Sequence, residues 1–379
     1  MMNRTFAATF VLVVGALIGA SLLPRPVVRA ADLKVCGTSD VQFLGYSDVL
    51  NKQSHGGLPL TELSGVAYEP GRGVYYVVAD RLGTTPAHVF TLTVPVSDDA
   101  MGVPFVTDVA RLADKDGAWF TGVNLDGEGI AMNSATDFFV SSEGGTVAGG
   151  QPAVHHFSIA GGYLGTLPVP SRFLIGTNNL SFEGLAMSPS KRSLFVVMEG
   201  PLPADGVTND FRSRIRILRY DNRGLEGYVP AEQYYYLSEA GRNATELGVS
   251  ELIALSDTEL LVLERGFVAG EGNTVRVYTA SLRGAQNVAN VAALATTTAA
   301  PLQKSLLFDL ATCPESGARL APGATQPNAL LDNFEAMTLG PALSGGRRAL
   351  VLLSDDNSGA NQTSRVVALA VSESKLQGR

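Results

Sequence analysis

Five segments of the sequence share one pattern, and this repetition limits the possible folds more than any other feature. In each segment a short apolar run is followed by a turn rich in Pro, Gly, Ser, Asp or Asn, and then by a second apolar run. The segments cover residues 63–81, 127–145, 182–200, 250–267 and 334–356. Short runs enriched in β-branched and aromatic residues, without a sustained helical period, predict β-strands, so we expect an all-β fold.

The stretches between these segments also contain runs typical of strands. Two such runs follow each of the first four segments, but only one, at residues 365–371, follows the last. An isolated apolar run at residues 41–49 can supply the missing strand. Four-stranded antiparallel units repeated around an axis are typical of a β-propeller. The sequence therefore predicts five four-stranded blades closed by the N-terminal strand.

A sixth blade is the alternative, because the spacing between the fourth and fifth segments is the widest. It would lie around residues 286–298, where alanine and asparagine instead favour a loop or short helix. A β-sandwich would not explain the repeating unit.

Composition excludes two classes of protein. The 379 residues are 45% hydrophobic and only 17% charged, which excludes intrinsic disorder. The formal net charge is −8 and no stripe of lysine and arginine is present, so we expect no nucleic-acid partner.

The first thirty residues differ from the rest. Arg4 precedes an almost wholly apolar run at residues 6–23, and residues 28–30 offer a signal-peptidase site. We expect residues 1–30 to be a signal peptide and 31–379 a single domain, secreted or periplasmic, monomeric, and not inserted in a membrane after cleavage. The alternative is an uncleaved anchor, since the run is just long enough to span a bilayer.

The chain has two cysteines, Cys36 and Cys313. In an exported protein they most simply form one disulfide, and two buried free thiols are the alternative.

Carboxylates recur at fixed places in the five segments. The first run of four segments begins with an acid: Glu128, Glu183, Glu251 and Glu335. The second run of all five segments ends on one: Asp80, Glu143, Glu199, Glu264 and Asp355. In a propeller the first strand of a blade begins at the end of the ring where the second strand finishes. We therefore expect these nine carboxylates at one mouth.

Carboxylates gathered this closely raise one another's pKa or bind a cation. Oxygen ligands without neighbouring cysteine or histidine favour Ca²⁺ before Mg²⁺. We expect the first set of acids to be catalytic and the second to hold the metal. Arg81 and Arg265 directly follow two of the acids and suit an anionic substrate group. The alternative is structural, with the acids pairing with arginine or joining neighbouring blades.

The motifs ELSGVAY, DGEGIAM, SFEGLAMSP, LLVLERGF and NFEAMTL, in this order, resemble the phytase-like family of "esterase-like activity of phytase" proteins. The resemblance runs from about residue 60 to 370. It implies an exported propeller that hydrolyses phosphate esters or related esters, by analogy with calcium-dependent propeller phytases. The chain departs from those phytases, because the paired aspartates at residues 98–99 lack the Asp-Asp-Pro-Ala context and lysines are few. Only the repeated acids, Arg81 and Arg265 match the family's own pattern.

These observations predict an exported, metal-assisted hydrolase of a small anionic ester. A non-catalytic, calcium-stabilised binding propeller is one alternative. A lactonase-like ester hydrolase is another, because Asn124, Asn179 and Asn333 lie near three of the segments.

Overall fold

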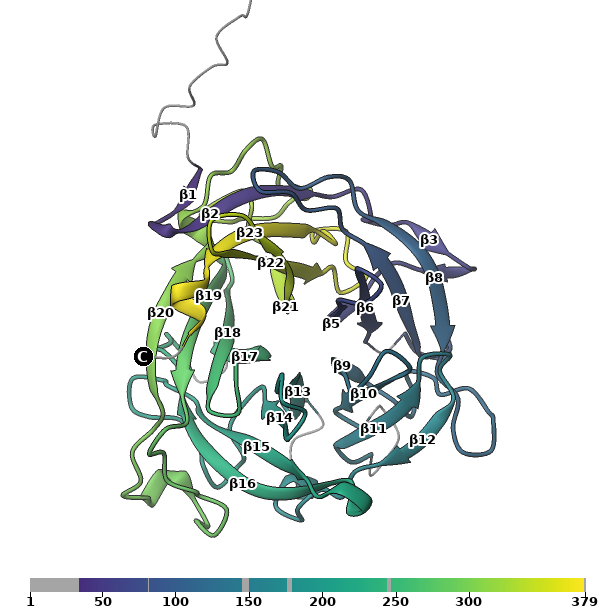
Figure 1. Cartoon of the computed structure of the whole chain (residues 1–379). Helices are drawn as coiled ribbons and strands as arrows, with labels where there is room; N and C mark the ends of the chain where they lie inside the picture. Colours follow the sequence, from purple (N-terminus) through teal and green to yellow (C-terminus); the bar gives the residue numbers. More distant parts are fainter. Residues whose placement is uncertain (1–33, 81, 145–149, 176–178, 244–246, 378–379) are drawn as a thin grey trace, which may run out of the picture. The chain divides into compact units, whose positions relative to one another are not determined.

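The computed structural model describes residues 34–80, 82–144, 150–175, 179–243 and 247–377, all within one compact unit, Lys34–Arg379. This unit is almost entirely β-structure, arranged as five antiparallel sheets in a ring (Figure 1). The prediction of a five-bladed β-propeller is confirmed. The proposed signal peptide, residues 1–30, lies outside the described residues. Among the described residues, no helix has the length and apolar character needed to cross a membrane.

Blades 1 to 3 are consecutive in the sequence, and each is ordered from its innermost strand outward. Their strands are β5 (Leu63–Glu69), β6 (Val74–Ala79), β7 (His88–Thr93) and β8 (Phe105–Arg111) in blade 1; β9 (Gly127–Met132), β10 (Asp137–Ser142), β11 (Ala153–Ser158) and β12 (Tyr163–Thr166) in blade 2; and β13 (Phe182–Met187), β14 (Ser193–Met198), β15 (Arg214–Asn222) and β16 (Tyr228–Leu237) in blade 3.

Blade 4 follows the same order, and blade 5 combines the two ends of the domain. The strands are β17 (Leu247–Ala254), β18 (Glu259–Val268), β19 (Gly272–Ser281) and β20 (Gln303–Asp309) in blade 4; and β21 (Asn333–Leu343), β22 (Arg347–Asp355), β23 (Val366–Ser372), β2 (Thr38–Ser47) and β1 (Val35–Cys36) in blade 5. The innermost strands contact one another in ring order, and β21 contacts β5 to close the circle.

The N-terminal strand closes blade 5. Strand β2 pairs antiparallel with β23, with Val41 opposite Val371 and Ser47 opposite Val366. The run predicted at residues 41–49 is therefore the fourth strand of the last blade, and β1 extends that sheet by one short strand.

The remaining elements are short. They are β3 (Ser54–His55), β4 (Leu58–Pro59), η2 (Phe173–Ile175), η3 (Gly224–Glu226), η4 (Leu294–Thr296), η5 (Leu310–Thr312) and α1 (Glu373–Leu376). Residues 286–298, the alternative position for a sixth blade, hold only the single 3₁₀ turn η4, so no blade forms there.

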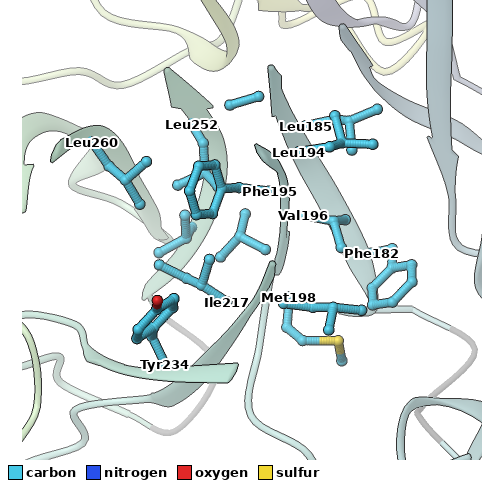
Figure 2. Close-up of a cluster of buried hydrophobic side chains, with 14 of the residues drawn as sticks. Phe182, Leu185, Leu194, Phe195, Val196, Met198, Ile217, Tyr234, Leu252 and Leu260 are labelled. Atoms are coloured by element: carbon cyan, nitrogen blue, oxygen red, sulfur yellow. The ribbon is translucent and has the colours of Figure 1, made fainter. Parts of the chain in front are cut away.

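Packing between blades explains why the second strands are continuously apolar. Every residue of β14 is buried, because one face of the strand packs on blade 2 and the other on blade 4. Figure 2 shows part of this cluster, in which Phe195 and Ile217 of blade 3 lie near Leu252 and Leu260 of blade 4. Burying a side chain such as Phe195 contributes roughly 1.5–3 kcal/mol. This inter-blade core fixes the inner strands that carry the acids.

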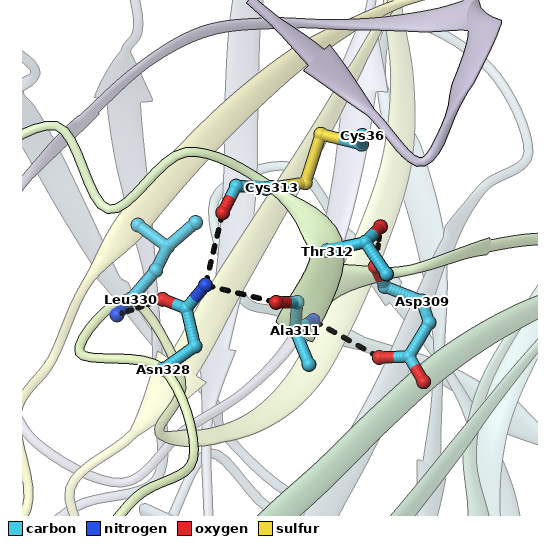
Figure 3. The surroundings of a disulfide bond; sticks show 7 residues. All are labelled: Cys36, Asp309, Ala311, Thr312, Cys313, Asn328 and Leu330. Atoms are coloured by element: carbon cyan, nitrogen blue, oxygen red, sulfur yellow. Dashed lines mark hydrogen bonds between the residues drawn. A yellow bond between two sulfur atoms is a disulfide. The ribbon is translucent and has the colours of Figure 1, made fainter.

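A disulfide joins blades 4 and 5. Cys36 of β1 bonds to Cys313, which directly follows η5, across a sequence separation of 277 residues (Figure 3). Both cysteines are buried. Beside the bond, the side-chain amide of Asn328 donates to the carbonyl oxygens of Ala311 and Cys313, both at 2.9 Å. The loop between Cys313 and Asn328 is therefore held at both of its ends.

Candidate functional site

A cavity of about 630 Å³ lies at the end of the ring where the inner strands begin. Seven carboxylates line it: Asp80, Glu128, Glu143, Glu183, Glu199, Glu335 and Asp355. We call this set the acidic mouth. Of the described residues that line the cavity, Arg265 is the one lysine or arginine. The cavity thus has a strong excess of negative groups.

Strand register explains why three of the predicted first-strand acids meet. In β13, Phe182 pairs with Met198 and Leu185 pairs with Val196, which leaves Glu183 at a bulge between the two pairs. The equivalent bulge positions in the other blades are Ser64, Glu128, Ser250 and Glu335. The first ring therefore holds three glutamates and two serines, and Ser64 Oγ donates to Glu128 Oε2 at 2.6 Å.

Glu251, expected in this ring, is displaced from it by one residue. The bulge of β17 falls at Ser250, so Glu251 occupies the position that Gly184 holds in blade 3. Its carboxylate is 1% exposed, does not line the cavity, and accepts the backbone N–H groups of Leu185 and Leu252 at 3.1 and 2.9 Å. Burial raises its pKa well above the ordinary value. Aligning Leu252 with Leu185, instead of acid with acid, would have given the correct register.

A second ring surrounds the first. Met198 and Glu264 hold equivalent pairing positions in β14 and β18, so Arg265 is the equivalent of Glu199. The ring consists of Asp80, Glu143, Glu199, Arg265 and Asp355. One blade therefore presents a cation where the other four present an acid. The glycine that follows both Glu199 and Arg265 in the sequence signals this alignment.

Glu264, expected among the metal ligands, lies outside the cavity. Successive strand residues point to opposite faces, so the one-residue offset turns its side chain away from the mouth. Its carboxylate accepts the Tyr236 hydroxyl at 2.6 Å and the Glu239 backbone N–H at 3.0 Å, and pairs with Lys304 at 2.5 Å. Its contacts are those of a structural residue.

Arg265 is bound to the acids around it. Its Nη2 lies 2.8 Å from Glu199 Oε1 and 3.1 Å from Glu335 Oε1. Burial opposes the charge of Arg265, but these carboxylates outweigh burial and hold its pKa above the ordinary value. Arg81, the other predicted anion-binding residue, lies outside the described residues.

The acids form two groups in which carboxylate oxygens lie within 4.8 Å of one another. One group is Asp80, Asp126 and Glu128, and the other is Glu143, Glu183 and Glu199. Opposite ligands of Ca²⁺ are separated by about 4.6–5.2 Å, twice the Ca–O distance, so each group fits one such ion. Sequence reasoning missed Asp126, although it stands only two residues before Glu128.

Electrostatics favours cation binding at these groups. Burial raises the pKa of Glu128 and Glu183 well above the ordinary value of 4.5, and neighbouring carboxylates raise both further. Burial also raises the pKa of Glu335 and Asp355, although Arg265 lowers that of Glu335. Holding these groups ionised without a counter-charge is unfavourable, and a bound divalent cation would relieve their repulsion.

Side-chain amides make up a further part of the lining, which sequence reasoning did not foresee. Asn273, Gln326, Asn357, Asn361 and Gln362 line the cavity from loops and strand ends of blades 4 and 5. Asn179 and Asn333 also line it, whereas Asn124 lies outside and accepts the backbone N–H of Thr121 at 2.8 Å.

Comparison with known proteins gives one family. The family model described as "Phytase-like: Esterase-like activity of phytase" matches residues 58–358. No curated protein matches the sequence.

Solved structures give distant likenesses. A β-1,2-mannobiose phosphorylase from Listeria innocua is 11% identical with a TM-score of 0.41, covering 89% of this chain and 92% of its own. A glycosyl hydrolase from Bacteroides ovatus is 9% identical with a TM-score of 0.38, covering 83% of this chain and 84% of its own. Likeness at this level does not extend to function.

Proposed function

The chain belongs to the Phytase-like family, and on that premise we propose that it is a metal-assisted hydrolase of phosphate esters or related esters. The observation that carries the proposal is the pair of carboxylate groups, in each of which the oxygens lie within 4.8 Å of one another; all their members except the buried Asp126 line one cavity of about 630 Å³. We propose calcium as the metal, because the ligands are all oxygens and their spacing suits its long metal–oxygen bonds.

The two groups would hold the metal. Bound there, calcium would polarise the ester and lower the pKa of a water molecule. Glu143, Glu183 and Glu199 come from adjacent blades 2 and 3, so the inter-blade core holds their spacing. The other group combines Asp80 of blade 1 with Asp126 and Glu128 of blade 2.

Glu335 would orient the attacking water and accept its proton. Asn333 Nδ2 and Arg265 Nη2 both contact Oε1 of Glu335, at 3.0 and 3.1 Å, so we assign Oε2 to the water. The raised pKa of Glu335 brings the carboxylate closer to the working range of a general base.

Arg265 would bind the anionic part of the substrate. It faces the cavity between Glu199 and Glu335, and a guanidinium group can contact a phosphate or carboxylate through two N–H groups. Metal bound to Glu199 would free part of the guanidinium for this contact.

The test uses the purified chain with p-nitrophenyl phosphate and p-nitrophenyl acetate. We expect turnover of at least one ester in calcium, its loss in chelator, and its return on adding calcium. Glu335→Gln should lower kcat at least a hundredfold while calcium still stabilises the fold. Turnover that is insensitive to chelator would remove the metal from the mechanism. Calcium stabilisation without turnover of any ester would leave a non-catalytic binding propeller.

Lactonase-like hydrolysis is the second candidate. Asn179 and Asn333 line the cavity beside the acids, and amide oxygens are also ligands of calcium. Turnover of a γ-lactone but not of phosphate esters would favour it.

We further propose that the protein is exported after cleavage of residues 1–30 and acts as a monomer on a small anionic ester. The buried Cys36–Cys313 disulfide supports an oxidising compartment. Mass spectrometry of the protein recovered from its source would test both the cleavage and the bond.

A further inference from the structure

The acidic mouth is asymmetric, and its other side has a different chemistry. Five of its seven carboxylates lie on blades 1 to 3, and blade 4 contributes none. Blades 4 and 5 instead contribute six side-chain amides to the cavity. One, Asn333, donates to Glu335. The other five we call the amide wall: Asn273, Gln326, Asn357, Asn361 and Gln362. Phe267 of β18 also lines the cavity and is 55% exposed.

The part of the amide wall that contains Asn273 and Gln326 is held in place by a hydrogen bond and close backbone packing. Gln326 Oε1 accepts the backbone N–H of Asn273 at 2.7 Å, which fixes the orientation of the Gln326 amide. A Cβ atom on Gly272, whose φ is +105°, would lie 2.4 Å from the carbonyl oxygen of Thr325, so only glycine allows this approach. The loop that carries Gln326 is anchored at both ends, by the disulfide and by Asn328 (Figure 3).

Side-chain amides gathered on one side of a cavity suit hydroxyl groups. Each amide offers an N–H donor and a carbonyl acceptor, and a hydroxyl both donates and accepts. A site built of such groups rejects an analogue without hydroxyls, because its polar atoms are then left without partners. The exposed ring of Phe267 offers a flat apolar surface for the C–H face of a saturated ring. These features together match a sugar-like alcohol.

The charges that line the cavity limit the number of anionic groups that the ligand can carry. Among the described lining residues Arg265 is the one cation, and two carboxylates already contact it. Further anionic groups would meet the acidic mouth, whose negative potential repels them.

We propose that the substrate is an ester of a polyhydroxylated, sugar-like alcohol with a single anionic group, its hydroxyls bound by the amide wall and its ring by Phe267. This inference rests on the proposed hydrolase function and names the substrate class of that same site.

The first experiment compares three phosphate esters with the calcium-loaded protein. We expect KM for glucose 6-phosphate to be at least tenfold below that for n-butyl phosphate, which lacks hydroxyls, and below that for fructose 1,6-bisphosphate, which carries two phosphates. Equal KM values for the first two esters, or the lowest value for the bisphosphate, would overturn the inference while leaving the hydrolase function intact.

The second experiment measures glucose 6-phosphate binding by calorimetry, so it does not depend on turnover. Phe267→Ala and Asn361→Ala alter exposed side chains and should each weaken binding at least fivefold. Phe105→Ala is the matched control, because Phe105 is 50% exposed on β8 and does not line the cavity. Binding that is weakened by both substitutions, without turnover of any ester tested, would support recognition of the sugar-like alcohol by the amide wall and Phe267 and would overturn the hydrolase proposal. Absence of binding, or equal weakening in the control, would overturn the inference.

Discussion

Arg265 and Glu199 occupy equivalent positions in neighbouring blades, and their side chains, which both line the cavity, form an ion pair at 2.8 Å. A ring of five equivalent positions thus carries one cation among four acids. This exchange of charge at a single blade leaves one cation in an otherwise anionic cavity, and it is the group to which we assign the anionic part of the substrate.

Replacing that cation should separate metal binding from substrate binding. In Arg265→Gln we expect tighter calcium binding, because a repelling charge is lost, and a KM for phosphate esters at least tenfold higher. Calorimetry and steady-state kinetics measure the two effects. Arg283→Gln is the control, since Arg283 is 60% exposed and pairs with Glu259 outside the cavity. An unchanged KM in Arg265→Gln would remove the arginine from substrate binding.

The metal-free protein should lose stability as pH rises. Burial and neighbouring carboxylates raise the pKa of Glu183 and Glu128 above 4.5 in the folded state, so the folded state binds more protons than the unfolded chain. Their protonation contributes stability that is present at low pH and is lost as pH rises from about 4.5 through the folded pKa. Thermal unfolding in chelator at pH 5 and pH 8 would show the lower Tm at pH 8. A higher Tm at pH 8 would contradict the raised pKa values of Glu128 and Glu183.

Removing one of these carboxylates should stabilise the metal-free protein, whereas most substitutions of buried residues are destabilising. Without metal at pH 8, Glu183→Gln should raise the Tm, because it removes a carboxylate from a repelling cluster. The same variant should lose most of the calcium-dependent stabilisation, which is about 2.7 kcal/mol for wild type at calcium a hundredfold above Kd. Glu226→Gln, on the exposed turn η3, serves as the control and should change neither value. A lower metal-free Tm in Glu183→Gln would show that the carboxylate is held by partners instead of repelled.

Glu264→Gln should lower the stability of the protein and leave calcium binding unchanged, the opposite of what we expect for Glu183→Gln. Its carboxylate is buried and binds Tyr236 and Lys304 away from the cavity, so the substitution should cost about 2 kcal/mol in unfolding free energy. Calcium affinity should stay at the wild-type value. Denaturant unfolding with and without calcium tests both statements. A loss of calcium binding would show that Glu264 is a metal ligand after all.

Loss of the disulfide should destabilise the ring. Cys36 and Cys313 are 277 residues apart, and a bond closing so long a loop contributes about 4 kcal/mol by restricting the unfolded chain. We expect Cys36→Ser with Cys313→Ser to lower the Tm and to raise KM, since the bond anchors the loop that carries Gln326. An unchanged Tm would show that strand pairing alone closes blade 5.

The fold was predictable because each strand is marked locally. Apolar runs such as the one in β14 are bounded by turns rich in small and polar residues. The last repeat has only three such runs, which indicates that the N-terminal run, now seen as β2, supplies its fourth strand. The site was harder, because a bulge moves a side chain to the other face without changing the residue type. The sequence pattern predicts Glu251 at the mouth because it does not reveal the bulge at Ser250, and it predicts Glu264 there because Glu264, instead of Arg265, is the acid that ends the run. The amide wall was not predicted, since Asn273, Gln326 and Asn361 come from separate loops and no period relates them.

The pairing of β2 with β23 also has a consequence for biogenesis. Val41 meets Val371 in the sheet, so a ribosome must produce more than three hundred intervening residues before these partners can find each other. Until then the nascent chain is an open arc with two unsatisfied sheet edges, which invite association with other chains. Blade 5 also supplies Glu335 and Asp355. The acidic mouth therefore becomes complete only late in synthesis, and a chaperone that shields the open arc would benefit this protein more than one whose blades close in order.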